Sequence, residues 1–261
     1  MQADIFTKRR NDRWIFFTAL IILTVGSIII TQYDVIKGFT SIIKAITWGG
    51  ANFYPNAKAM TKLPDMLVKL WETILMSIAA TTVAAIFAIC LSLVGSQTTR
   101  VNKMFSIISR GIASLFRNIP LVAWAMVLML AFSQSALTGF LALFCGSLGF
   151  LTRAFMETID EVSNNSVEAL KATGANFLPI IFHAVLPSSM PQMISWLLYM
   201  IETNIRDATL VGMLTGTGIG FSFELYYKSL NYHAASLVVI LIVITVIAME
   251  IVSNNVRRVI L

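Results

Sequence analysis

Charged side chains are scarce in this sequence of 261 residues. They make up 12% of the chain, whereas hydrophobic residues make up 57%, and the mean hydropathy is +0.80. A soluble globular domain carries roughly twice that share of charge. The composition therefore excludes an ordinary soluble domain and predicts a protein that lies in a membrane.

The residues that catalysis and nucleotide binding require are also missing. A phosphate-binding P-loop needs a Gly-Lys pair before Ser or Thr, and the sequence has none. It contains two histidines, His183 and His233, no His-Glu-x-x-His zinc motif and no Gly-x-Ser-x-Gly nucleophile elbow. We therefore predict that the chain is not an enzyme, has no cofactor and does not bind ATP through a P-loop.

Cysteine is equally rare. Cys90 and Cys145 lie in apolar runs without His or Cys at metal-binding spacing, so we expect buried small hydrophobic side chains and no disulfide or metal site.

The net charge of +6 comes from Lys and Arg at the ends of apolar runs. Because these residues form no single basic stripe, they indicate membrane topology and argue against nucleic-acid binding.

Six apolar runs are long enough to cross a hydrocarbon core of roughly 30 Å, which requires about 20 helical residues. They are approximately Trp14–Ile30, Leu67–Val94, Met104–Phe132, Ala136–Met156, Pro187–Leu214 and Ala234–Val252. The first run follows basic residues, as a secretory signal does, but the bulky residues after it form no cleavage site, so we predict an uncleaved anchor. The fold class is therefore an all-α membrane protein with about six transmembrane helices.

Lys and Arg near the ends of the runs predict the orientation, because they are enriched on the cytoplasmic side. Both termini and the segment around Glu168 then lie in the cytoplasm of a multi-pass cell-membrane protein. Lysines in the long segment after the first run weaken this rule there, although long loops follow it less strictly. The cytoplasmic group is Lys8, Arg9, Arg10, Arg13, Arg100, Lys103, Arg110, Arg153, Lys171, Arg257 and Arg258.

A polar segment between the fourth and fifth runs predicts a docking loop. Asn165 can cap a short helix with Glu168 in the capping-box position, and Gly174 stands where a helix ends in the left-handed conformation. A helix of about two turns is not stable alone in water. We therefore expect it to dock into a groove of a partner protein.

Three charged residues, Glu202, Arg206 and Asp207, fall inside the fifth run. Charges at membrane depth are costly and mark functional sites, because they face a bundle interior or a watery cavity. Glu202 and Arg206 are four residues apart and can also form a purely structural ion pair. We expect the pair, together with Asn204, to line a translocation pathway or its gate, with Asp207 unbalanced.

Two breaks interrupt the apolar runs. Pro120, which follows Arg117, predicts a kink or interruption of the third run, and Arg117 either snorkels to the interface or faces the cavity. The glycine-rich segment Gly212–Gly220 matches a nucleotide-binding loop only superficially, since no strand precedes it. We expect a turn or re-entrant segment near the outer mouth.

Several motifs together resemble a known family. Glu168-Ala169-Leu170 with Gly174, followed by Leu186-Pro187, is similar to the EAA loop of membrane subunits of bacterial ABC importers, with Leu170 in place of the usual alanine. The motif from Glu202 to Met213, which includes Asn204, Arg206, Ala208 and Thr209, resembles the permeases of phosphonate importers. Arg117-Asn118-Ile119-Pro120 and Gly218-Ile219-Gly220 add to this resemblance.

The resemblance implies a type I ABC importer permease fold and a set of partners. These are two cytoplasmic ATPases, a second permease copy, and an extracytoplasmic solute-binding protein that delivers phosphonate, phosphite or a related oxyanion. The likeness covers the core permease domain, residues 67–261, with its coupling loop at 157–187; residues 1–66 form a cytoplasmic tail, the first transmembrane helix and an external loop.

Other functions remain open from the sequence. Methionine-importer permeases share a similar arginine-containing stretch and are the alternative within the ABC importers. An ion channel or passive pore belongs to another class, and it would conduct without using the Glu168 loop. The halves of the chain do not visibly repeat each other, which argues against a self-contained carrier and favours a pathway between two copies, as a homodimer or a paralogous heterodimer.

Overall fold

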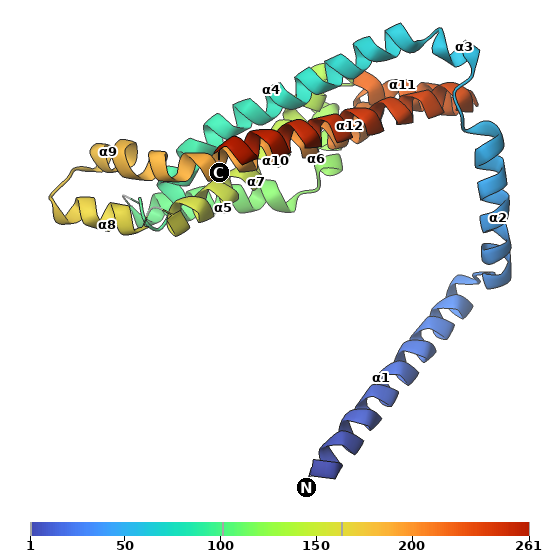
Figure 1. Cartoon of the computed structure of the whole chain (residues 1–261), viewed down its shortest axis with the longest axis horizontal. Helices are drawn as coiled ribbons and strands as arrows, with labels where there is room; N and C mark the ends of the chain where they lie inside the picture. The colour runs from blue at the N-terminus through green and yellow to red at the C-terminus, as the bar shows by residue number, and fades with distance from the viewer. Residues whose placement is uncertain (1, 101, 163, 261) are drawn as a thin grey trace. The chain divides into compact units, whose positions relative to one another are not determined.

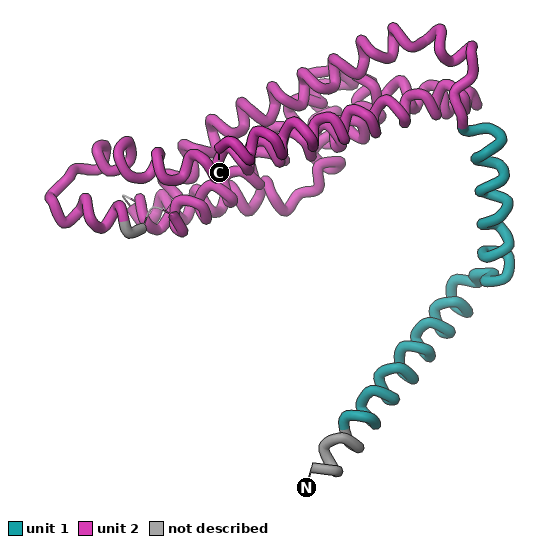
Figure 2. The backbone as a smooth tube through the Cα atoms, in the orientation of Figure 1, with its two compact units in different colours: residues 1–53 teal, residues 54–261 magenta. Residues whose placement is uncertain are grey.

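The computed structural model describes residues 2–100, 102–162 and 164–260 (Figure 1), and its contacts divide the chain into unit 1, Met1–Phe53, and unit 2, Tyr54–Leu261 (Figure 2). Every regular element among these residues is helical. Unit 1 contains α1 (Gln2–Thr31) and α2 (Val35–Asn52). The elements of unit 2 are α3 (Ala57–Met60), α4 (Leu63–Gly95), α5 (Lys103–Asn118), α6 (Leu121–Phe132), α7 (Ala136–Val162), α8 (Asn164–Ala172), α9 (Phe177–Ile180), the π-helical turn η1 (Ile181–Val185), α10 (Leu186–Thr215), α11 (Gly218–Lys228) and α12 (Tyr232–Ile260).

Among the described residues, five helical segments are long and apolar enough to cross a membrane, and the bent pair α5–α6 provides a sixth. The predicted all-α fold with about six transmembrane helices is therefore confirmed. The fifth span is longer than its apolar run predicts, because α9 and η1 continue into α10. The five segments are Arg9–Thr31, Leu63–Gly95, Ala136–Val162, Phe177–Thr215 and Tyr232–Ile260.

Helix α2 was not expected within the external segment of unit 1. Asp34 caps it, since its carboxylate accepts a hydrogen bond of 2.9 Å from the backbone N–H of Lys37. The helix has no buried residue, and large side chains such as Phe39 and Ile43 are exposed. An amphipathic helix of this kind is typical of the interface between a membrane and water.

Small side chains on α4 form the centre of unit 2. Thr73, Ser77, Thr81, Ala84 and Ala88 follow one another at helical spacing and are buried. Small residues let the backbones of membrane helices approach closely, and packing then replaces the hydrophobic driving force that lipid does not provide. Helices α7 and α10 pack against this stripe, and their larger side chains complete the core.

The interruption predicted at Pro120 is an elbow in which α5 and α6 meet at 93°. Ile119 is extended, as expected for a residue before proline. The indole N–H of Trp124 donates to the carbonyl of Phe116 at 3.4 Å, and the two rings stack with centroids 5.1 Å apart. A Cβ on Gly149 of α7 would lie 2.7 Å from the carbonyl carbon of Phe116. The elbow therefore fits only against a glycine.

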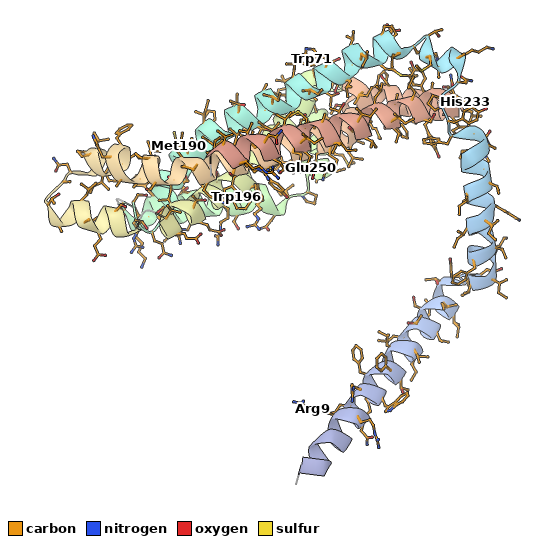
Figure 3. The ribbon with its side chains drawn as sticks, viewed as in Figure 1. Arg9, Trp71, Met190, Trp196, His233 and Glu250 are labelled. Atoms are coloured by element: carbon orange, nitrogen blue, oxygen red, sulfur yellow. The ribbon has the colours of Figure 1, made fainter. Side chains whose placement is uncertain are left out.

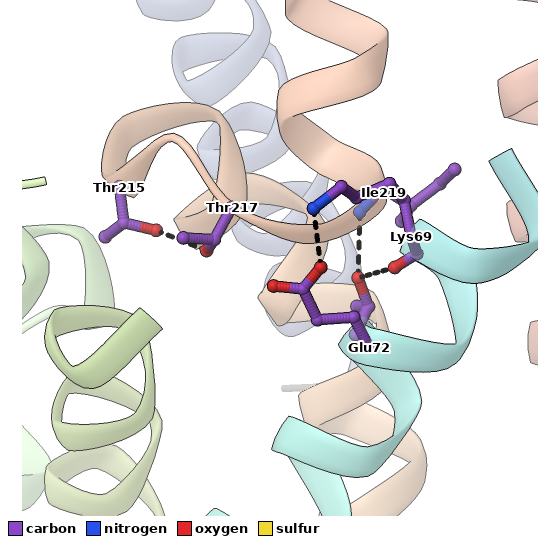
Figure 4. Close-up of polar contacts among 6 residues, drawn as sticks. Lys69, Glu72, Thr215, Thr217 and Ile219 are labelled. Atoms are coloured by element: carbon purple, nitrogen blue, oxygen red, sulfur yellow. Dashed lines mark hydrogen bonds and ion pairs between the residues drawn. The ribbon is translucent and has the colours of Figure 1, made fainter. Parts of the chain in front are cut away.

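The glycine-rich segment contains a tight turn followed by α11. Gly216 ends α10 in the left-handed conformation, and α11 begins two residues later. The hydroxyl of Thr73 accepts a hydrogen bond of 2.9 Å from the backbone N–H of Ile219, one of the unpaired donors of the first turn of α11 (Figure 4). The turn was expected, but the eleven-residue helix was not.

Three finer expectations change in the structure. Cys145 is buried as predicted, but Cys90 is exposed on α4, because it lies away from the small-residue stripe. Helix α8 begins at Asn164, so Asn165 lies inside its first turn and not at the predicted cap. The expected boundary after Met66 falls within α4, where Met66 packs in one cluster with Ala59 of α3.

Candidate coupling loop and translocation residues

The segment around Gly174 forms a helix, a turn and a second helix at one end of unit 2, where Figure 1 labels α8 and α9. The backbone N–H of Ala175 bonds to the carbonyl of Leu170 at 3.2 Å, and that of Gly174 bonds to the carbonyl of Lys171 at 3.0 Å. This pair of bonds is a Schellman motif. Gly174 has φ of 78°, so the predicted left-handed conformation is present.

One side of this loop packs on the core and the other is exposed. Val167 is 2% exposed, and Leu170 packs against the same cluster. Glu168 and Ala169 point to the outside. The loop therefore has an anchored face and an open face with large apolar side chains. These open apolar side chains are Phe177, Leu178 and Phe182.

The end of the loop is the start of α10. Leu186 and Pro187 occupy the first turn of this helix. The π-helical turn η1 precedes them without a break. A displacement of α9 is therefore transmitted directly to α10.

A polar tie connects the loop to the α4–α5 connection. The carboxylate of Asp160 accepts hydrogen bonds from the hydroxyl of Ser96 and from both the backbone N–H and the hydroxyl of Thr98, the latter two at 3.0 Å. The ammonium of Lys171 in α8 donates to the carbonyl of Thr98 at 3.4 Å. This tie is not predictable from the sequence, because its partners are more than 60 residues apart along the chain.

Asn204 lies inside the protomer, with 1% of its surface exposed. Its amide nitrogen donates to the hydroxyls of Thr81 and Ser147, each at 2.6 Å. Those hydroxyls donate their own hydrogens to the carbonyls of Ser77 and Leu143 one turn earlier. Asn204 therefore joins α10 to α4 and α7 and fixes the rotation of α10 about its axis.

The rotation set by Asn204 leaves the Arg206 side chain exposed and the Glu202 side chain mostly covered. A guanidinium nitrogen of Arg206 lies 3.2 Å from a carboxylate oxygen of Glu202, and their side chains are 56% and 16% exposed. Asp207 beside them is half-buried. Arg206 stands nine residues before Thr215, the last residue of α10, which is roughly 14 Å and places the pair near the middle of the apolar layer.

Arg117 occupies the last turn of α5, at the elbow. Its side chain is exposed and borders a small cavity together with Arg110 and Arg153. The structure therefore does not group Arg117 with Glu202 and Arg206. From the sequence, Arg110 and Arg153 are only indicators of membrane topology. Because they are far apart along the chain, their shared cavity is not predictable from the sequence.

The opposite end of unit 2 carries a second polar group. The ammonium of Lys62 lies 4.4 Å from the ring centre of Tyr226 in α11. Burial, and then the Asp65 carboxylate, raise the pKa of the Tyr226 hydroxyl. Figure 3 shows His233 at this same end, where its ring bonds to the carbonyl of Tyr54 at 2.7 Å.

Comparisons with known proteins agree with this architecture. Residues 88–260 match the family described as binding-protein-dependent transport system inner membrane component. A phosphite transport system permease protein of Stutzerimonas stutzeri is 33% identical over 180 residues, which are 68% of this chain and 66% of that protein. A putative cryptic phosphonate transport system permease protein of Escherichia coli (strain K12) is 36% identical over 118 residues, 45% of this chain and 97% of that protein.

Among solved structures, an inward-facing form of the MetNI methionine ABC transporter aligns with a TM-score of 0.67 at 20% identity. The alignment covers 75% of this chain and 96% of that one. At this identity the likeness concerns the fold. Together with the family match, it shows that the chain belongs to the binding-protein-dependent transport system inner membrane components and has the fold of a type I ABC importer permease.

Proposed function

We propose that the chain is the pore-forming subunit of an ABC importer that carries a phosphorus oxyanion such as phosphite, phosphonate or phosphate. The observation that carries this proposal is the exposed guanidinium of Arg206, which is paired with the mostly covered Glu202 and faces out of the protomer near the middle of the apolar layer. Charged groups at that depth are not stable against lipid and face water or protein. The names of the two relatives supply the class of substrate.

The same observation supports a dimer. If α10 turns Arg206 outward, a second permease is required to enclose the pathway, and two-fold symmetry is the usual solution for such assemblies. Either a second copy of this chain or a paralogue would serve. Asn204 then acts from inside the protomer by holding the charged face of α10 toward the pathway.

The partners follow from the family and from the loop. The Glu168–Pro187 loop presents the apolar face of Phe177, Leu178 and Phe182 to a cytoplasmic ATPase, with Glu168, Ala169, Leu170, Gly174, Leu186 and Pro187 as its framework. An extracytoplasmic binding protein delivers the solute to the α11 end. Both termini lie in the cytoplasm, and ATP is hydrolysed by the separate subunit.

The direct test is reconstitution. The chain, its ATPase and its binding protein are placed together in proteoliposomes, and uptake of labelled phosphite, methylphosphonate and methionine is measured. We expect ATP-dependent uptake of the phosphorus oxyanions, and no saturable ATP binding by the chain purified alone. Uptake of methionine only would assign the alternative importer class, and ion conduction by the chain alone would assign a channel.

Glu202 and Arg206 are expected to be energetically coupled. Replacing Glu202 with glutamine leaves the exposed Arg206 cation without its partner, and Arg206→Gln leaves the mostly covered Glu202 carboxylate without its cation. In a double-mutant cycle we expect a coupling free energy of about 1 kcal/mol in stability. The double variant should regain membrane abundance without regaining uptake, because the oxyanion still lacks its cation. Additive effects in abundance would exclude the ion pair.

A further inference from the structure

Three arginine side chains meet at one small cavity of unit 2, outside the Glu202–Arg206 pair. Arg110 and Arg117 come from α5, and Arg153 comes from α7. The cavity has a volume of about 150 Å³. Its remaining lining residues are Ala113, Ser114 and Asn118.

Helix geometry brings these side chains together. Arg110, Ser114 and Arg117 are separated by four and three residues, so they follow one face of α5. This helix crosses α7 so closely at Gly149 that a Cβ there would lie 2.7 Å from the Phe116 carbonyl carbon. Arg153 stands one turn after Gly149 and therefore reaches the same side of the crossing.

Most of the guanidinium donors in this cluster have no partner among the residues that the structure describes. Arg110 uses its Nε to donate to the carbonyl of Gly95 at 2.9 Å. Arg153 uses its Nε to donate to a Glu157 carboxylate oxygen at 2.6 Å. The side chain of Arg117 makes no hydrogen bond or ion pair with any residue that the structure describes. Each guanidinium carries five N–H donors, so the cavity has many more donors than acceptors.

Acidic side chains gather on the other side of Arg110 and Arg153. These two arginines also border an adjoining cavity of about 390 Å³ that is lined by Glu157, Asp160 and Glu161. None of the three acids lines the smaller cavity, and Asp160 is already held by Ser96 and Thr98. The local charge therefore changes from acidic to basic along the α5–α7 crossing, and an anion is attracted only to the α5 side.

We infer that the cavity between Arg110, Arg117 and Arg153 binds a tetrahedral phosphorus oxyanion. Guanidinium groups match such anions because their planar fork donates two parallel hydrogen bonds to two oxygens. The Ser114 hydroxyl and the Asn118 amide add neutral donors. The phosphate headgroup of an anionic lipid has the same chemistry as a transported phosphorus oxyanion. That the bound anion is the transported solute therefore rests on the proposed function.

The arginine cavity lies closer to the α8 end of unit 2 than Arg206 does. Arg153 lies nine residues before the end of α7, roughly 14 Å, and Arg117 lies fourteen residues after the start of α5, roughly 21 Å. Both distances are measured from the α8 end, where the ATPase docks in the proposed assembly. Arg206 lies twenty residues, roughly 30 Å, after the start of α10, so the arginine cavity is nearer to the α8 end than Arg206 is. In the proposed assembly this order places the cavity on the cytoplasmic side of Arg206.

The test measures binding of inorganic phosphate and methylphosphonate to the assembled permease–ATPase complex in nanodiscs of phosphatidylcholine. We expect Arg117→Gln to weaken binding about ten- to a hundredfold, the loss typical of charge-assisted hydrogen bonds. The affinity of Arg117→Lys should fall between those of the wild type and Arg117→Gln, because lysine keeps the charge and lacks the planar fork of the guanidinium. Arg258→Gln in the last turn of α12 removes the same charge elsewhere and should leave binding unchanged. Thermal unfolding of each variant verifies that the complex is folded.

A second arm distinguishes the source of the anion. In nanodiscs that contain phosphatidylglycerol, native mass spectrometry counts the lipids retained by the purified complex. If a lipid headgroup occupies the cavity, Arg117→Gln should retain one phosphatidylglycerol fewer per protomer than Arg258→Gln. The lipid should also suppress phosphate binding to the wild type. Equal phosphate affinity and equal lipid retention in Arg117→Gln and wild type would overturn the inference.

Failure of this site and failure of the proposed function give different results. If binding does not depend on Arg117 while the reconstituted importer still takes up phosphite, the arginine cavity is excluded and the importer stands. If the importer takes up no phosphorus oxyanion while Arg117-dependent phosphate binding persists, the anion site stands and the transported solute is different.

Discussion

Uptake is expected to stop when Gly174 is replaced by valine, although the chain still reaches the membrane. Gly174 has φ of 78° and no atom within 4 Å of the position of a Cβ. Side-chain volume is therefore no obstacle, and the whole effect comes from the left-handed backbone, which costs a β-branched residue about 1 to 3 kcal/mol. Relief of that strain breaks the Schellman motif and turns Phe177 and Leu178 away from the proposed ATPase surface.

Asparagine at the same position is the matched control. It adopts the left-handed conformation more readily than other residues that carry a Cβ, so Gly174→Asn should retain most of the uptake. The measurements are ATPase co-purification, uptake and membrane abundance for both variants. Normal co-purification and uptake in Gly174→Val at wild-type abundance would show that this turn does not couple to the ATPase.

A single methyl group on Gly220 is expected to remove most of the folded protein. The Cβ of an alanine there would lie 2.9 Å from the carbonyl carbon of Thr209, closer still to its oxygen, and 3.0 Å from the backbone nitrogen of Met213. These are backbone atoms of α10, which cannot rotate away as a side chain can. We expect Gly220→Ala to lower the free energy of unfolding by about 3 kcal/mol, as overpacking does in tight interiors.

Gly111→Ala provides the control for this experiment. No atom lies within 4 Å of a Cβ at Gly111 in α5, and alanine favours a helix over glycine by about 1 kcal/mol. Membrane abundance and thermal unfolding in detergent should therefore fall for Gly220→Ala and remain the same or rise for Gly111→Ala. Equal stability of Gly220→Ala and wild type would mean that α10 and α11 are not packed this closely.

The transmembrane helices and the elbow were predictable because each depends on local physics. A run of apolar residues is sufficient to identify a span, and Pro120 alone disfavours a helix before it. The left-handed turn at Gly174 was predictable as well, because a glycine at the end of a helix usually adopts that conformation. Helix α11 was missed because glycines were taken to mean an irregular backbone. In the structure, Gly220 instead provides the close approach to α10.

Long-range polar contacts were not accessible from the sequence. Asn204 bonds to Thr81 and Ser147, which are 123 and 57 residues away. Its place in the motif suggested the pathway, whereas its side chain points into the protomer. Arg110 and Arg153 were understood as topology residues because positive charge near a helix end has that simpler meaning. Only the crossing of α5 over α7 places them in one cavity.

The elbow also has a consequence for how the protein enters the membrane during synthesis. Helices α5 and α6 have 16 and 12 residues, or roughly 24 and 18 Å, so neither alone crosses a hydrocarbon layer of about 30 Å. Arg110, near the middle of α5, adds an insertion cost of about 2.5 to 3.5 kcal/mol, the value for the centre of a membrane helix. The translocon therefore has little reason to release α5 into lipid when it emerges from the ribosome. Its stable place exists only after α7 has been made, because Gly149 provides the surface against which the elbow closes. We therefore expect the third span, α5 with α6, to reach its packed position in the membrane only after α7, although it is synthesised before α7.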